Sequence, residues 1–448
     1  MSPESRLRSE IQKAVLQLFG QQTDEFQLQP TNKEFAGSHT LVCFPLTRIT
    51  RKKPEETAAA IGQYLLSHSS IVKEFNVVKG FLNLTLNDPV WVDALQRIYE
   101  RPDYGQLPSN GEELMIEYSS PNTNKPLHLG HLRNNFLGWS VAEICRANGY
   151  QVHKVQIIND RGIHICKSMA AWKLYGDGES PENTGMKGDH LVGKYYVAFD
   201  KAHKAQVKAL MEKGSTEEEA SRQAPIMKLA VDMLQKWEQK DPDVVALWKM
   251  MNGWVYSGFE ATYKRMGVDF EKLYYESDTY LLGKEEVMKG VEQGVFFRKA
   301  DGSVWVDLTS DGLDQKLLLR SDGTSVYMTQ DIGTAILRFR DFPGISGQIY
   351  TVGNEQEYHF KALFLILRKL GYEWATRCYH LSYGMVDLPT GKMKSREGTV
   401  VDADDLMEEM VQEAEKQTKE LGKLEGTTAE EARQLFEMIG LGALKFFL

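Results

Sequence analysis

The string SSPNTNKPLHLGH, from Ser119 to His131, holds the densest group of side chains able to handle phosphate. An apolar run, Leu114 to Tyr118, precedes it, and apolar residues at helical spacing follow it. This order predicts a strand, a turn and a helix, so that the first N–H groups of the helix face a bound phosphate. His128 and His131 can both donate to phosphoryl oxygens, and Gly130 between them leaves room for a flat base.

Lys125 adds positive charge to the same turn. A surface turn with two solvated histidines is the simpler alternative, because a bare HxGH string often arises by chance. The position of the string between a strand and a helix favours the phosphate site. HLGH resembles the HIGH signature of class I aminoacyl-tRNA synthetases, and SSPNTNKPLHLGHLRNN is similar to the arginyl members, with a likeness that extends over essentially all 448 residues.

The string GKMKSREG, from Gly391 to Gly398, is the second candidate. Lys392, Lys394 and Arg396 form a basic loop between glycines, which could close over the β and γ phosphates of a nucleotide. Taken alone, the string fits a solvated charged turn better. Because it follows HLGH by about 260 residues, it resembles the KMSKS signature of the same class.

Ser395 departs from that signature, because the general class has its second lysine at this position. Many arginyl members share the loss and carry a lysine just before the HIGH string, which is the position of Lys125. Lys394 lies one residue from Ser395 and could also replace the missing lysine. Both lysines therefore remain candidates.

The string SDGTSVYMTQDIG concerns the substrate side chain, since it places Tyr327 and Asp331 four residues apart. If the segment is helical, the two lie on one face. A guanidinium is a planar fork of donors that carboxylates bind in bidentate geometry. The resemblance implies that Tyr327 and Asp331 hold the guanidinium of arginine, helped by an acidic residue at Glu117. Without the resemblance, Asp331 would be interpreted as a helix-start carboxylate.

Further contacts are also implied by the resemblance. Those to the backbone end of the amino acid are assigned to Ser120, Asn122 and Gln356. Those to ATP are assigned to Gly130, Gly353, Glu355 and His359. Glu355 follows an expected strand, where a carboxylate suits ribose hydroxyls. The string NDRGIH, from Asn159 to His164, differs from the corresponding string of many arginyl members, so no role is predicted for it.

Composition excludes several classes of protein. With 42% hydrophobic and 26% charged residues, the chain is expected to be soluble and to form two to four domains. Its charged start does not resemble a signal peptide, and no apolar run approaches membrane length, so no membrane contact and a cytoplasmic location are expected. The four cysteines are far apart and form no CxxC pair, which argues against disulfides and zinc, and no metal site is predicted.

The net charge of −9 is unevenly distributed. From Val401 onward the sequence has 12 acidic and 5 basic residues, a net charge of −7, which leaves −2 for the rest. A nearly neutral body can hold the local basic patches that binding to tRNA requires.

The predicted fold class is α/β, with a class I Rossmann-type catalytic domain in which a helical insertion splits the parallel sheet. Residues 1–110 are expected to form an α+β domain that contacts tRNA, as the resemblance implies. Residues 111–400 form the catalytic domain, with an insertion at about 175–270 that either meets the tRNA acceptor end or is a solvated helical spacer. Residues 401–448 resemble the incomplete start of a helical anticodon-binding domain.

Some local features are also predicted. Ser215 and Glu218 are expected to form a capping box, and Pro225 and Pro242 to break the helical run of the insertion. Because the last segment ends within an apolar face, we expect a truncated chain. The side chains expected to be partly exposed as a result are Phe436, Ile439, Leu444, Phe446 and Phe447.

These features predict an arginine–tRNA ligase that works as a monomer. It would activate arginine with ATP, assisted by Mg²⁺, to arginyl-adenylate and pyrophosphate, and transfer arginine to the 3′ end of its tRNA. Catalysis would rest on positioning and charge stabilisation rather than on a protein nucleophile. The alternatives are an HxGH nucleotidylyltransferase and a non-catalytic tRNA-binding paralogue, although the latter would be expected to lack the signature histidines or Lys392.

Overall fold

The computed structural model describes residues 2–386, 400–422, 424 and 426–448. The chain divides into two compact units, Met1–Gln106 and Leu107–Leu448. Across the described residues, no helix is both long enough and apolar enough to span a lipid bilayer.

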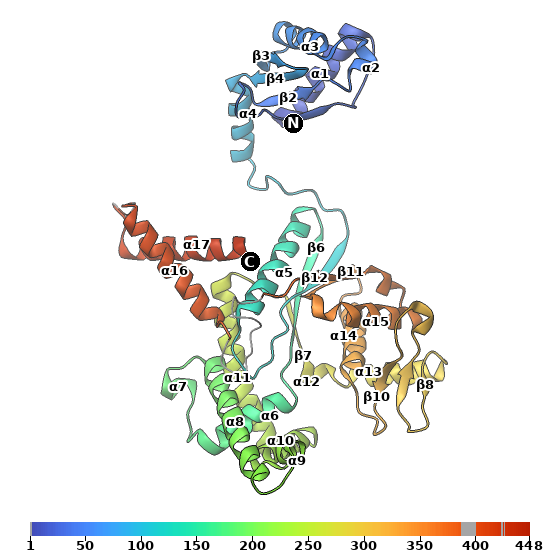
Figure 1. The fold of residues 1–448 in the computed structure, drawn as a ribbon, viewed down its shortest axis with the longest axis vertical. Helices are drawn as coiled ribbons and strands as arrows, with labels where there is room; N and C mark the ends of the chain where they lie inside the picture. Colours follow the sequence, from blue (N-terminus) through green and yellow to red (C-terminus); the bar gives the residue numbers. More distant parts are fainter. Residues whose placement is uncertain (1, 387–399, 423, 425) are drawn as a thin grey trace. The chain divides into compact units, whose positions relative to one another are not determined.

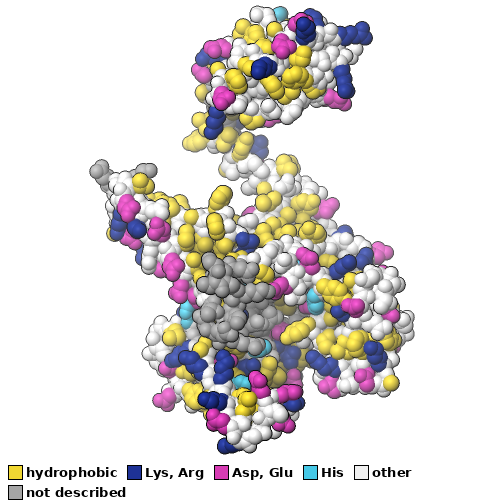
Figure 2. Space-filling model, in the orientation of Figure 1, with side chains coloured by type: hydrophobic (Ala, Val, Ile, Leu, Met, Phe, Trp, Pro, Cys, Tyr) yellow, Lys and Arg dark blue, Asp and Glu magenta, His cyan; other side chains and the backbone are white. Residues whose placement is uncertain are grey.

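The first unit is built on an antiparallel sheet with strand order β1-β2-β4-β3 (Figure 1). Its elements are α1 (Pro3–Phe19), β1 (Gln27–Pro30), β2 (His39–Val42), α2 (Thr47–Thr50), α3 (Pro54–His68), β3 (Val72–Val78), β4 (Phe81–Leu86) and α4 (Asp88–Tyr99). The helix α3 packs on β3 and β4, and α1 packs on α3. Leu7, Ile61 and Leu82 lie in the buried core between these layers. Apolar side chains also remain on the surface of this unit in Figure 2, and Val92 and Leu95 of α4 are among the exposed ones.

The second unit is organised around a five-stranded parallel sheet with strand order β12-β11-β5-β6-β7. The strands are β5 (Glu113–Glu117), β6 (Gln151–Ile158), β7 (Lys272–Tyr275), β11 (Ile345–Gly353) and β12 (Cys378–Tyr383). The helix α5 (Leu129–Ala147) joins β5 to β6, which confirms the predicted strand, turn and helix. Because all five strands are parallel, their carboxyl ends lie at one edge, where α/β proteins bind ligands.

The helical insertion lies between β6 and β7. Its helices are α6 (Ile163–Tyr175), α7 (Pro181–Thr184), α8 (Gly188–Met211), α9 (Glu217–Gln223), α10 (Pro225–Glu238) and α11 (Pro242–Met266). Two of them begin at Pro225 and Pro242, as predicted, because proline fits the first turn of a helix. The predicted capping box is wrong by one residue and is formed by Thr216 and Glu219. The N–H of Ser215 still bonds the carbonyl oxygen of Leu210 in the turn that ends α8, so the cap falls on the next hydroxyl residue.

A second lobe of this unit combines helices with a small antiparallel sheet of order β10-β9-β8. It contains α12 (Glu276–Thr279), α13 (Leu282–Glu292), β8 (Phe297–Arg298), β9 (Val304–Val306), η1 (Thr309–Asp311), β10 (Lys316–Leu319), α14 (Tyr327–Asp341), η2 (Asn354–Gln356), α15 (Glu357–Lys369) and η3 (Glu373–Arg377). The hairpin β8–β9 encloses Ala300–Gly302. Its own core includes Val304, Ile332 and Leu363.

The last two helices, α16 (Ala403–Glu420) and α17 (Ala429–Phe447), pack against each other. The prediction of exposed apolar side chains is right for Ile439, Phe446 and Phe447 and wrong for Phe436 and Leu444, which are buried. The reason is that α17 folds back onto α16, and Leu444 reaches the main core. At the crossing the helices are so close that a side chain at Gly440 would lie 2.7 Å from the carbonyl oxygen of Met410.

Candidate active site

The HLGH string lies at the start of α5, in the connection that follows β5. Its two histidines form the capping box of that helix. The N–H of His128 donates to Nδ1 of His131 over 3.1 Å, and the N–H of Gly130 donates to Nδ1 of His128 over 3.1 Å. The imidazole rings are 3.9 Å apart between centroids. Since Nδ1 of each ring accepts, the proton of each neutral ring is on Nε2. The capping thus fixes the tautomer and leaves two Nε2–H donors.

Both histidines are neutral at physiological pH. Burial, assisted by the charge of Lys125, lowers the pKa of His128 to about 4. Burial and the neighbouring His128 hold the pKa of His131 well below its usual range. The turn can therefore offer hydrogen bonds to phosphate without titrating near neutrality.

Residues that follow the second signature lie against the first. The N–H of Leu129 donates to the carbonyl oxygen of Val401 over 3.0 Å, and the N–H of Ala403 donates to that of Leu127 over 3.1 Å. The basic residues predicted from the second signature, namely Lys392, Lys394 and Arg396, lie outside the described residues. The backbone bonds place the residues from Val401 to Ala403, which follow that string in the sequence, beside the HLGH turn.

A pocket of about 230 Å³ opens at this junction. Lys125 and His128 line it from the turn, His190 and Tyr196 from α8, and Asp402 from the segment before α16. It therefore lies between the HLGH turn, the segment just before α16 and the helical insertion.

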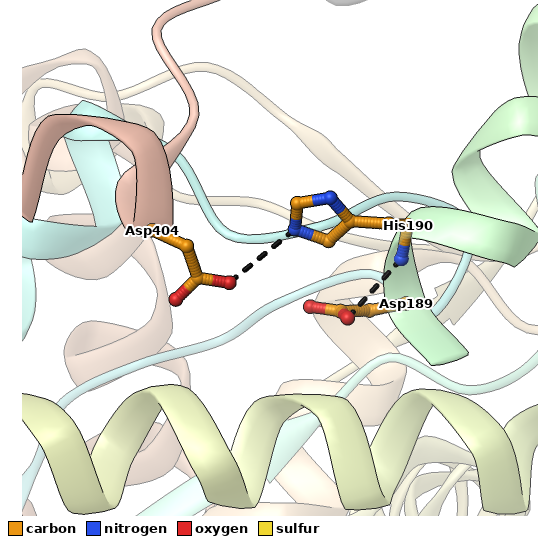
Figure 3. Close-up of side chains that lie close together, drawn as sticks. All are labelled: Asp189, His190 and Asp404. Carbon is orange, nitrogen blue, oxygen red and sulfur yellow. Dashed lines mark hydrogen bonds and ion pairs between the residues drawn. The ribbon is translucent and has the colours of Figure 1, made fainter. Parts of the chain in front are cut away.

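A charged cluster attaches α16 to the insertion (Figure 3). The ammonium of Lys187 bonds Asp404 over 2.6 Å and Asp189 over 3.1 Å, and Nε2 of His190 lies 3.3 Å from Asp404. Asp189, His190 and Asp404 have the chemistry of metal ligands, but the cationic position between the carboxylates is already held by Lys187. The hydrogen bond to Asp404 raises the pKa of His190. Burial disfavours ionisation of Asp404, but hydrogen bonds from His190 and Lys187 outweigh it and hold the pKa below its usual range.

The residues predicted to hold a guanidinium are only partly brought together. Tyr327 and Asp331 lie one turn apart on α14, but the Tyr327 side chain is 77% exposed. A carboxylate oxygen of Asp331 is instead 2.6 Å from Nε2 of His359, which had been assigned to ATP. The structure therefore places His359 beside the candidate amino-acid site.

Glu117 already has an internal guanidinium partner. Its buried carboxylate pairs with Arg338 of α14, which is also buried. The Arg338 guanidinium lies 5.1 Å from the ring centroid of Tyr274 and 5.7 Å from that of Tyr350. Burial raises the pKa of Glu117 and the charge of Arg338 opposes the rise. Glu117, the last residue of β5, is thus buried and already paired with a cation of the chain itself.

Glu276 is the residue that sequence reasoning missed. It follows β7 directly at the ligand-binding edge and begins α12, which packs on α14. Burial raises its pKa to about 7; the charge of Arg161 opposes the rise, while those of Asp160 and Asp331 reinforce it. The negative charges of Asp160 and Asp331 therefore act on Glu276, which makes the carboxylates at this edge candidates for contact with a cationic substrate group. A carboxylate directly after a strand was the available signal, but β7 has only four residues and lies just beyond the predicted insertion.

The other predicted residues also lie at the carboxyl edge of the sheet. Ser120 and Asn122 are exposed in the turn after β5, where the side-chain amide of Asn159 donates to the carbonyl oxygen of Ser120 over 3.0 Å. Gly353 is the last residue of β11, and η2, which follows it, contains Glu355 and Gln356. The same edge of the sheet therefore carries the two histidines that could donate hydrogen bonds to phosphate and the carboxylates of Glu276 and Asp331.

Comparisons with known proteins agree with this arrangement. A family model described as "tRNA synthetases class I (R), catalytic domain" matches residues 96–447, and one described as "Arginyl tRNA synthetase N terminal domain" matches residues 5–86. The chain belongs to the class I arginyl-tRNA synthetase family.

Relatives in this family are similar along the whole chain. The arginine–tRNA ligase of Bacteroides thetaiotaomicron is 60% identical over 452 residues, and that of Porphyromonas gingivalis is 56% identical over 452 residues. Each alignment covers 100% of this chain and 76% of the relative, so the chain spans about three quarters of the length of these synthetases. The solved arginyl-tRNA synthetase of Thermus thermophilus, which is 24% identical, shares the fold with a TM-score of 0.64 over 100% of this chain and 75% of its own.

Proposed function

We propose that this member of the arginyl-tRNA synthetase family is an arginine–tRNA ligase that works through arginyl-adenylate. The observation that carries the proposal is the presence of Asp331 and Glu276 at the same sheet edge as the neutral His128–His131 pair. The carboxylates suit the guanidinium of arginine, and the imidazole N–H groups suit the phosphates of ATP.

In the first step, a carboxylate oxygen of arginine attacks the α-phosphorus of ATP, and pyrophosphate leaves. ATP enters as its Mg²⁺ complex. His128 and His131 donate Nε2–H to phosphoryl oxygens, and Lys125 supplies positive charge. The loop that carries Lys392, Lys394 and Arg396 stabilises the departing pyrophosphate. In the second step, a hydroxyl of the terminal ribose of tRNA attacks the arginyl carbonyl carbon, and AMP leaves.

Three groups of residues are proposed to position the substrates: one for the guanidinium of arginine, one for its amino and carboxylate groups, and one for the nucleoside of ATP. Asp331 and Glu276 hold the guanidinium, with Tyr327 as a wall and His359 as the hydrogen-bond partner that orients Asp331. Glu117 would affect arginine binding only indirectly, through its ion pair with Arg338. The amino and carboxylate groups of arginine are assigned to Ser120, Asn122 and Gln356, and the nucleoside of ATP to Gly130, Gly353 and Glu355.

Binding of tRNA is proposed for the rest of the chain. Residues 1–110 would contact the tRNA body, the insertion would meet the acceptor end, and residues 401–448 would belong to the anticodon-binding region. We further propose that the protein is cytoplasmic and monomeric. Light scattering with and without tRNA would test the monomeric state.

The test is an adenylate assay with each amino acid in the presence of ATP and tRNA. Release of pyrophosphate and charging of tRNA should depend on arginine and fail with lysine. Substitution of both histidines, His128→Ala and His131→Ala, should abolish both activities while leaving arginine binding measurable by calorimetry. Nucleotidyl transfer without arginine would instead favour an HxGH nucleotidylyltransferase.

A further inference from the structure

The carboxylate of Asp160, at the carboxyl end of β6, is buried and accepts three hydrogen bonds. The N–H of Ser277 donates to Oδ1 over 2.8 Å, and the hydroxyl of Ser277 donates to Oδ2 over 2.7 Å. The hydroxyl of Tyr256, from α11, donates to Oδ2 over 2.9 Å. Asp160 is only 1% exposed, so these bonds replace water that the carboxylate has lost.

The backbone of Asp160 is held as firmly as its side chain. Its carbonyl oxygen accepts from Nε1 of Trp248 over 2.6 Å and from the side-chain amide of Asn252 over 3.2 Å. Both donors come from α11, the helix that also provides Tyr256. The insertion therefore fixes the position of this carboxylate relative to β6.

Through its two hydrogen bonds with Ser277, Asp160 fixes the start of α12. Ser277 is the residue after Glu276, so two bonds to Ser277 restrict the backbone from which the Glu276 side chain projects. Asp160 and Asp331 both disfavour ionisation of Glu276, so the three carboxylates occupy a region of concentrated negative charge. Such a group of acids is costly unless a cation compensates it. Arg161 supplies part of the compensation, although its guanidinium also bonds Glu238 over 3.0 Å and stacks 3.9 Å from the ring centroid of Tyr280.

We propose that Asp160 is a positioning residue for arginine recognition, which clamps Ser277 so that Glu276 faces the guanidinium together with Asp331. This inference rests on the proposed function, because it assigns Glu276 to the substrate. No role was predicted for the string that contains Asp160, because it differs from the corresponding string of many arginyl members. The partners of Asp160 lie 88 to 117 residues away in the sequence, so only the structure shows them.

Direct binding tests the proposal without depending on catalysis. Calorimetric titration of arginine and of ATP would be carried out on the parent protein and on Asp160→Ala, Asp160→Asn and Ser277→Ala. Asp160→Ala should weaken arginine binding about tenfold or more and change ATP affinity by less than about twofold. Asp160→Asn keeps an acceptor for the N–H of Ser277 and should restore part of the loss. Ser277→Ala removes one of the two bonds and should give a smaller effect.

Asp341→Asn is the matched control. Asp341 accepts a hydrogen bond from the Tyr274 hydroxyl over 3.1 Å and bonds Lys272 over 2.6 Å, so it also ties β7 to its surroundings, from α14. It contacts β7 through Lys272 and Tyr274, which belong to the strand itself, rather than through the residues that follow the strand. Asp341→Asn should lower the melting temperature but leave arginine affinity unchanged.

The outcomes separate this inference from the proposed function. If the parent protein does not bind arginine, the proposed function fails. If the parent binds arginine and the Asp160 variants bind it equally well, only the positioning role is overturned. Equal weakening of arginine and ATP binding would assign Asp160 a purely structural role. If Asp160→Ala gives no cooperative unfolding transition, Asp160→Asn and Ser277→Ala decide, and normal arginine affinity in both overturns the proposal.

Discussion

At the scale of single residues, the raised pKa of Glu276 predicts how arginine affinity depends on pH. Burial holds this pKa near 7, so about half of the free protein carries the protonated, neutral carboxyl at pH 7. Arginine should bind the ionised form, because the guanidinium needs a carboxylate partner. Arginine affinity should therefore increase about tenfold between pH 6 and pH 8, with proton release on binding. Calorimetry in buffers of different ionisation enthalpy measures both quantities, and Glu276→Gln should remove the pH dependence.

Asp331 provides a second test at the same scale. Asp331→Asn removes one charged hydrogen-bond acceptor from the proposed guanidinium site, which is worth about 1.5–3 kcal/mol. Arginine affinity should decrease accordingly while ATP affinity is retained. His359→Gln should have a smaller effect, because His359 only orients the carboxylate through the 2.6 Å contact. Unchanged arginine affinity in Asp331→Asn would remove this residue from the site.

The missing lysine of the second signature can also be assigned by substitution. If Lys125 replaces it, Lys125→Ala should slow adenylate formation by about 10²–10³, the usual effect of losing one donor to a transition state. Ser395→Lys in the same background should recover part of the rate. Single-turnover kinetics measures both, and a parent-like rate for Lys125→Ala would point to Lys394.

At the scale of elements, sequence patterns predicted best where the signal is local. The apolar run, the turn and the amphipathic segment around HLGH gave β5 and α5, and two prolines gave the starts of α10 and α11. The short strand β7 was missed because its four residues, Lys-Leu-Tyr-Tyr, show no clear alternation. The cap at Thr216 was displaced by one residue because the preceding helix end uses the N–H of Ser215.

Site residues that depend on distant partners could not be predicted. The pairing of Glu117 with Arg338 joins positions separated by 221 residues, and no spacing rule indicates it. The same holds for His359, whose type suggested a phosphate donor but whose neighbour in the structure is Asp331. The sequence predicted which edge of the sheet carries the candidate site, whereas the partners of each residue at that edge could be found only from the tertiary contacts.

The cluster that joins α8 to α16 predicts a pH-dependent contribution to stability. His190 faces Asp404, Asp402, Asp189 and Lys187, and its pKa in the folded protein is raised. Its contribution is therefore complete below the unfolded pKa of about 6.5 and is lost as pH rises through the folded value. His190→Gln should reduce the free energy of unfolding more at pH 6 than at pH 8.5, by about 1 kcal/mol or less because the side chain is partly exposed. Urea unfolding at the two pH values measures this difference, and an equal loss at both would contradict it.

At the scale of the whole molecule, the candidate catalytic residues all belong to the second of the two compact units. All the described residues assigned to ATP and arginine lie within Leu107–Leu448, whose cores include Ile116, Leu132 and Ile332. The unit Met1–Gln106 has its own core around Leu7, Ile61 and Leu82. Each unit thus buries apolar surface independently, which is the physical condition for folding alone.

This separation predicts that substrate activation and tRNA use can be uncoupled. A protein restricted to residues 107–448 should fold cooperatively and bind arginine and ATP within about twofold of the parent, because every described side chain proposed to contact them is retained. If residues 1–110 contact tRNA as proposed, the same protein should bind and charge tRNA more weakly. Calorimetry for the small ligands and a charging assay for tRNA give the two measurements side by side. Loss of arginine binding would show that the first unit supports the catalytic unit, and undiminished charging would remove the first unit from tRNA recognition.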